Sequence, residues 1–71
     1  MPYRSNDDLP RPARNHLPPR AQGIYREAFN HCFASHRDDV RQEEIAHRTA
    51  RAAVKRVYTK LGDQWMPLRQ W

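Results

Sequence analysis

The sequence predicts a mainly α-helical fold: a small compact helical domain with two long amphipathic helices packed together and a short N-terminal helix. Apolar side chains recur every three or four positions in two long stretches, which is the spacing of a helix with one buried face. Five of the six prolines lie within residues 1–20, so regular structure there must be short. At 71 residues the chain is expected to form a single domain over residues 1–71, with residues 1–8 and 66–71 flexible.

The first predicted element is a short helix within "DLPRPARNHLP" at residues 8–18. Proline suits the first helical turn, because the N–H that it lacks would have no partner there. We expect Leu9, Ala13 and Leu17 to face inward. The double proline at 18–19 then ends this helix and begins the next.

The second predicted element is an amphipathic helix from Pro19 to about His36. Gly23 lies inside it and costs about 1 kcal/mol relative to alanine, which the regular spacing outweighs. Its apolar positions are Ala21, Ile24, Tyr25, Ala28, Phe29, Cys32 and Phe33.

The third predicted element is a long helix that runs to about Leu61. Asp39 is a good N-cap residue, and Gln42 three positions later can complete a capping box. Gly62 is expected to act as the C-cap. The inward residues predicted for this helix are Ala46, Ala50, Ala53, Val54, Val57, Tyr58 and Leu61.

The segment after Gly62 contains Pro67 and is too short for another helix. We expect Trp65 to fold back over one end of the core. The sequence also allows a minimal two-stranded ribbon joining the termini, in which the segment around Trp65 pairs with "PYR" at residues 2–4. The predicted core consists of Tyr25, Phe29, Phe33, Val54, Val57, Tyr58 and Trp65.

The charge of the chain favours anionic partners. Thirteen Lys and Arg residues stand against eight Asp and Glu residues, giving a net charge of +5. Such a surplus is typical of proteins that meet nucleic acid, phospholipid headgroups or acidic protein surfaces. A basic stripe on the outer side of the third helix is the candidate partner-binding site: Arg41, Arg48, Arg51, Lys55 and Arg56. The alternative is a solvated helix face with internal ion pairs such as Glu44 to Arg48.

Two other clusters have a functional and a structural interpretation. Cys32 and His36 lie four positions apart, with His31 near them, and could hold zinc if His47 and one more ligand approached. Cys32 also fits the apolar stripe of the second helix as a small core residue, and we favour this packing role. Asp38, Asp39, Glu43 and Glu44 could attract a hard cation, but helix capping explains the same residues without a calcium loop.

The composition gives no support to catalysis. No nucleophile stands beside an oriented base, and no paired carboxylates mark a cleft, so we expect neither enzyme activity nor a cofactor. One cysteine excludes an internal disulfide and agrees with a reducing compartment. Because the sequence shows no apolar run that could span a membrane and no secretory leader, a cytoplasmic location is expected.

Several blocks of the sequence resemble the ChaB family, described as cation transport regulators. These are "MPY" at 1–3, "DLP" at 8–10, "LP" at 17–18, "IYREAFN" at 24–30 and "EEIAHRTARAAVKRVYTKLGDQW" at 43–65. The resemblance implies a compact, mainly helical domain with a small strand element and no enzyme activity. It also implies a role in modulating a sodium/calcium–proton antiporter in bacteria. The strongly basic charge departs from what we expect of the family.

Two functional hypotheses follow, from different classes. The resemblance implies a small non-enzymatic regulator that binds a protein partner, a membrane cation/proton antiporter. The charge suggests a basic accessory protein that contacts the phosphate backbone of DNA or RNA. No aromatic residue is interleaved with the basic stripe, so base stacking on single strands is less expected than backbone contact.

Overall fold

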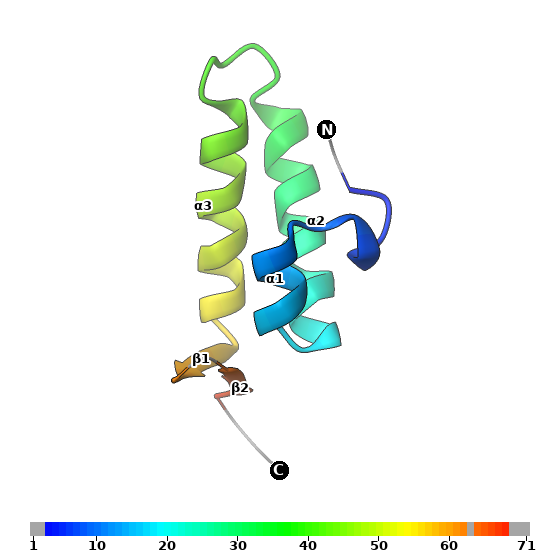
Figure 1. Ribbon diagram of the computed structural model, residues 1–71. Helices are drawn as coiled ribbons and strands as arrows, with labels where there is room; N and C mark the ends of the chain where they lie inside the picture. Colours follow the sequence, from blue (N-terminus) through cyan, green and yellow to red (C-terminus); the bar gives the residue numbers. More distant parts are fainter. Residues whose placement is uncertain (1–2, 63, 69–71) are drawn as a thin grey trace.

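The computed structural model describes residues 3–62 and 64–68. These form a one-turn helix η1 (Asn6–Asp8), helices α1 (Arg11–His16), α2 (Pro19–Ser35) and α3 (Gln42–Lys55), and strands β1 (Tyr58–Leu61) and β2 (Gln64–Pro67). The two long helices run antiparallel, α1 lies against them, and the two strands close one end (Figure 1). The predicted fold class is therefore confirmed.

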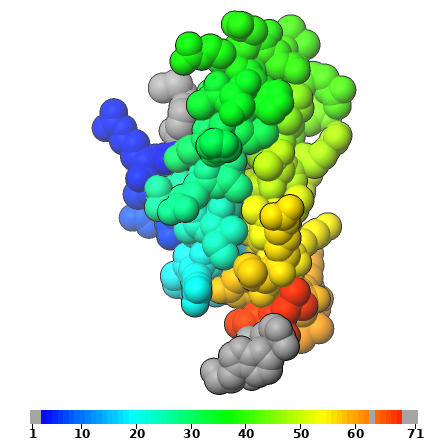
Figure 2. All heavy atoms as spheres, turned by 180° about the vertical axis from the view of Figure 1, so that it is seen from behind, coloured from blue at the N-terminus to red at the C-terminus, as the bar shows by residue number. Residues whose placement is uncertain are grey.

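The core lies between α2 and α3. Ala46 and Ala50 are fully buried on α3, and such small side chains let the two helix backbones approach closely. Phe29 from α2 and Val54 from α3 are the largest fully buried side chains among the described residues. Seen from behind as spheres, the two helices lie against each other with the strands at their lower end (Figure 2).

The N-terminal segment contains the short helix α1, and its apolar residues face inward as predicted. Leu9 and Leu17 are buried on either side of α1, and Ala13 is partly buried between them. Farther towards the N-terminus, the Tyr3 N–H donates to the Asn30 side-chain carbonyl, and the Asn30 amide donates back to the Tyr3 carbonyl, both at 2.8 Å. Two reciprocal hydrogen bonds therefore attach the chain around Tyr3 to α2.

The third helix is shorter than predicted. We expected it to reach Leu61, but α3 ends at Lys55, and the chain enters a β-hairpin at Tyr58. Residues 57–59, Val-Tyr-Thr, are β-branched or aromatic, and such residues favour strands. Gly62, predicted as a helix C-cap, instead lies in the hairpin turn with φ of 64°, a left-handed conformation that two-residue hairpin turns require.

The hairpin explains two further corrections. The strands are antiparallel, with Thr59 opposite Met66 and Lys60 opposite Trp65, so the ribbon pairs two C-terminal segments instead of joining the termini. Alternation along β1 then points Tyr58 into the core and its neighbours away from it. Val57 is consequently 46% exposed, and its assignment to the core is wrong. Of the predicted core, Tyr25, Phe29, Val54 and Tyr58 are buried, whereas Phe33 and Trp65 are partly buried.

The predicted capping box at Asp39 and Gln42 does not form. Arg41 occupies the N-cap position of α3, and its backbone N–H donates to Asp39 Oδ1 at 2.8 Å in the preceding turn. The Gln42 side-chain amide donates to the Phe33 carbonyl at 2.6 Å and so ties the start of α3 to the end of α2. Residues 1–2 and 69–71 lie outside the described residues, and the flexibility expected for 1–8 and 66–71 stays a prediction.

Candidate functional site

The five residues of the basic stripe are all exposed, but they occupy different positions along α3. Arg48, Arg51 and Lys55 project from the body of α3, whereas Arg41 and Arg56 are the residues that flank its two ends. Whether this stripe binds a partner stays a prediction. The neighbours of each cation decide how much of its charge is available.

Two of the five cations share one acidic residue. Arg41 donates from Nε and from a terminal nitrogen to the two Glu44 carboxylate oxygens, at 3.3 and 3.2 Å, and Arg48 lies 3.9 Å from the same carboxylate. The hydrogen bond from Arg41 is the main cause that lowers the pKa of Glu44. Because these side chains are exposed, the pairs add little to stability. They do neutralise part of the stripe around Arg41 and Arg48.

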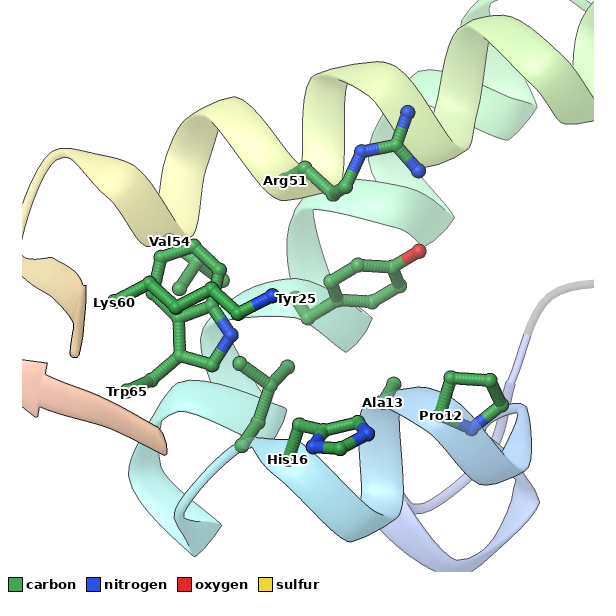
Figure 3. Close-up of a pocket in the computed structure, with 9 residues that line it drawn as sticks. Pro12, Ala13, His16, Tyr25, Arg51, Val54, Lys60 and Trp65 are labelled. Atoms are coloured by element: carbon green, nitrogen blue, oxygen red, sulfur yellow. The ribbon is translucent and has the colours of Figure 1, made fainter. Parts of the chain in front are cut away.

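The remaining cations have no acidic partner in the described part of the chain. Arg51, Lys55 and Arg56 form no ion pair there. Arg51 differs from the other two because it stands at the edge of α3 that faces α1 and the hairpin, beside the Tyr25 hydroxyl (Figure 3). Its positive charge opposes protonation of His47 and lowers the pKa of that imidazole.

His47 is a polar member of the helix interface. Its Nδ1 lies 2.6 Å from the Tyr25 hydroxyl, and its ring lies against Phe29 with centroids 4.6 Å apart. Nε2 lies 3.9 Å from Glu43 Oε2. With the proton on Nε2, the Tyr25 hydroxyl donates to Nδ1, and this assignment gives both ring nitrogens a partner. Burial is the main cause that lowers the pKa of His47, and it therefore favours the neutral imidazole.

A groove opens between α1, α3 and the hairpin, with a volume of about 220 Å³; we call it the α1–hairpin groove. Its apolar floor is formed by Ala13, Leu17, Val54 and Trp65. Its rim carries the Arg51 guanidinium, the Lys60 ammonium, the His16 imidazole and the Tyr25 ring, with Pro12 at one side (Figure 3). None of the described residues that line it is acidic. The groove thus combines an apolar interior with a positively charged rim.

The hairpin has a second, outward surface. Because Thr59 lies opposite Met66 and the Leu68 N–H donates to the Val57 carbonyl, the alternate residues of both strands share one side. We call its apolar members, which are all exposed, the outer hairpin face: Val57, Leu61, Met66 and Leu68. Lys55 and Arg56 immediately precede it in the chain. An apolar patch beside cations is typical of a surface that meets another molecule.

The cysteine–histidine cluster and the acidic cluster singled out in the sequence both have structural roles in the fold. Cys32 is buried, and its thiol donates to Thr49 Oγ1 at 3.4 Å, while the His36 Nδ1–H donates to the Cys32 carbonyl at 2.9 Å. The acidic residues Glu43 and Glu44 occupy the first turn of α3, where the helix dipole favours them. Among residues 3–62 and 64–68, no group of three or more His, Cys, Asp or Glu side chains is placed to hold a metal ion.

Comparison with known proteins decides the family. The ChaB family model matches residues 9–67. A protein of Escherichia coli K12 named "Putative cation transport regulator ChaB" is 45% identical over 69 residues, which span 89% of this chain and 91% of that protein; the Shigella flexneri protein of the same name matches equally. The NMR solution structure of a protein with that name superimposes with a TM-score of 0.83 at 41% identity, covering 96% of this chain and all of the other.

The chain belongs to the ChaB family. The resemblance seen in the sequence blocks is therefore confirmed, and so is the helical fold with a small strand element that it implied. None of the helices in the described part of this ChaB-family protein is long and apolar enough to cross a bilayer.

Sequence reasoning missed the groove residues Lys60 and Trp65, because it assigned Lys60 to a helix. The signal was present in "YTKLGDQWMP" at residues 58–67. Two short stretches of strand-forming residues there flank the dipeptide Gly-Asp, which is typical of two-residue hairpin turns in sequences. With the hairpin recognised, the cross-strand pair of Lys60 and Trp65 follows from its register.

Proposed function

We propose that this ChaB-family protein is a small regulatory binding protein without enzyme activity, which acts in the cytoplasm by docking on a membrane cation/proton antiporter. The name of its relatives as cation transport regulators supports a regulatory role.

The outer hairpin face is the observation that carries the proposal. Leu61 is 62% exposed and Leu68 is 51% exposed, so apolar surface that folding usually covers is open to a partner. Protein interfaces commonly have an apolar centre and a polar rim. Here Lys55 and Arg56 would lie at such a rim, so the partner surface should offer an apolar patch with acidic residues at its edge.

A transport assay tests this function. Inside-out membrane vesicles that contain one sodium/calcium–proton antiporter expose its cytoplasmic side, and proton flux is followed after addition of sodium or calcium. We expect the protein to change the initial rate in a saturable manner. The double substitution Leu61→Ser/Met66→Ser should remove most of the effect.

The control is Val40→Ser, in the turn at the opposite end of α2 and α3. Val40 is fully exposed, like the hairpin residues, but it lies far from them along the long helices (Figure 1). This variant should act like the unchanged protein. An initial rate that stays constant at saturating protein would contradict the proposed function.

A further inference from the structure

The α1–hairpin groove has the size of a small ligand. Its volume of about 220 Å³ exceeds the roughly 150 Å³ of an apolar cavity that holds one benzene ring. It is smaller than the roughly 300–1,000 Å³ of drug-sized pockets. The groove can therefore take one ring or one branched side chain together with a small polar group.

The positive charges at the rim of the groove indicate that the polar group of the ligand is an anion. Arg51 comes from α3 and Lys60 from β1, and neither forms an ion pair within the described residues. Lys60 lies directly opposite Trp65 across the hairpin, so its alkyl chain follows the indole, and its nitrogen points towards the side of Tyr25 (Figure 3). Two cations from different elements thus line the groove, with the Lys60 nitrogen beside the Tyr25 ring and the Arg51 guanidinium near the Tyr25 hydroxyl (Figure 3).

We propose that the α1–hairpin groove binds a small monoanion in which a carboxylate stands next to an aromatic or branched apolar group. The apolar group would lie on Leu17, Val54 and the Trp65 ring. The carboxylate would accept hydrogen bonds from the Arg51 guanidinium and the Lys60 ammonium. This assignment does not depend on the antiporter, because the groove and the outer hairpin face lie on opposite sides of the hairpin.

Two sources offer this chemistry. One is a free carboxylic acid with a single ring or branched chain. The other is the C-terminal residue of a polypeptide, where the main-chain carboxylate stands beside an apolar side chain. The charge and size of the groove suit both, and peptides distinguish them.

An NMR titration with 3-phenylpropionate tests the groove. The probe carries one ring and one carboxylate, and the signals followed are the Trp65 indole N–H, assigned with a Trp71→Phe variant, and the amides of Ala13, Val54 and Lys60. We expect saturable shifts with a millimolar Kd. The neutral control, 3-phenylpropionamide, should bind at least tenfold more weakly. Equal affinity for acid and amide, or no saturable shift, would overturn the proposal.

Substitutions locate the anion. Arg51→Met and Lys60→Met each remove one charge and keep an apolar chain, and each should weaken the acid about fivefold or more. Arg48→Met is the matched control, because it makes the same change in net charge on α3 outside the groove. It should alter the Kd less than twofold. An equal loss in Arg48→Met would show general charge attraction and overturn the assignment, provided that all three spectra remain those of the folded protein.

Peptides identify the source. If Gly-Gly-Phe with a free carboxylate binds as tightly as 3-phenylpropionate while its amidated form does not, the groove is assigned to polypeptide C-termini. If only the small acid binds, the groove is assigned to a free carboxylic acid. Both results support the groove as an anion site, and failure of the peptide and of the acid overturns it.

Discussion

The Tyr25 hydroxyl and His47 Nδ1 lie 2.6 Å apart between α2 and α3. This hydrogen bond joins the two long helices within an interface that is otherwise mostly apolar. On the far side of the imidazole, Nε2 faces Glu43, and Arg51 adds positive charge one turn further along α3. A titratable group therefore lies inside the contact that holds the fold together.

The setting of His47 predicts a pH dependence of stability. Its pKa is lowered in the folded state, first by burial and then by Arg51, with Glu43 acting in the opposite direction. As pH falls below about 6.5, the unfolded chain therefore binds a proton that the folded chain resists. The free energy of unfolding should therefore decrease as the pH is lowered from about 6.5 to the pKa of His47 in the folded state. Below that pKa both states carry the proton, so His47 should cause no further decrease in stability.

Urea denaturation at several pH values measures this effect, with His47→Gln as the matched variant. Glutamine can still accept a hydrogen bond from Tyr25, but it does not titrate. The decrease in stability between neutral and mildly acidic pH should be smaller in His47→Gln than in the unchanged protein. Parallel curves for the two proteins would show that His47 does not carry the pH dependence.

Replacement of Phe29 tests the core. Its side chain is fully buried against the rings of Tyr3, Phe33 and His47, so Phe29→Ala should cost about 3–5 kcal/mol. A small helical domain is rarely more stable than about 3–5 kcal/mol, so this variant should lose most of its helical circular dichroism at room temperature. Phe33→Ala removes the same ring from a partly buried position and should cost less. An unchanged melting temperature in Phe29→Ala would contradict the described core.

The two glycines should respond in opposite directions to alanine. Gly62 has a positive φ of 64°, which alanine tolerates poorly, so Gly62→Ala should destabilise the protein by about 1 kcal/mol. Gly23 lies within α2, and a methyl group there meets nothing within 4 Å, so Gly23→Ala should stabilise by about 0.5–1 kcal/mol. Thermal melts of both variants measure this; a stabilising Gly62→Ala would contradict the described turn, and a destabilising Gly23→Ala would contradict the open surroundings of Gly23 in α2.

The basic stripe should bind polyanions such as DNA only weakly, and this binding should weaken further as the salt concentration rises. Glu44 already neutralises part of the charge of Arg41 and Arg48. We expect a short DNA duplex to bind more weakly than micromolar even at low salt. A micromolar complex that weakens steeply with salt and disappears in Arg48→Ala/Arg51→Ala/Lys55→Ala would favour the nucleic-acid hypothesis instead.

The sequence predicts an element reliably where its apolar spacing fits one kind of secondary structure. It does not do so where the same residues fit both a helix and a strand. Between Ala21 and Cys32 the apolar residues recur every three or four positions, which fits only a helix, and this segment does form α2. Around Val57 the same spacing continues by chance into residues that favour strands, so helix and hairpin compete. The hairpin prevails because Gly62 turns the chain and Trp65 gains a partly buried place against the core.

The candidate site divides in the same way. The positions of Arg48 and Lys55 on one helix face follow from helical spacing alone. The groove does not, because it brings Ala13 next to the hairpin pair of Lys60 and Trp65, which lies far from Ala13 in the chain. Only the packing of α1 and the hairpin against α3 places them side by side.

Direct binding to a sodium/calcium–proton antiporter held in lipid nanodiscs tests the central claim most closely. We predict saturable binding to nanodiscs with the antiporter, little binding to empty nanodiscs, and at least tenfold weaker binding for Leu61→Ser/Met66→Ser, while Val40→Ser binds normally. No binding, or the same binding to loaded and empty nanodiscs, would contradict the account.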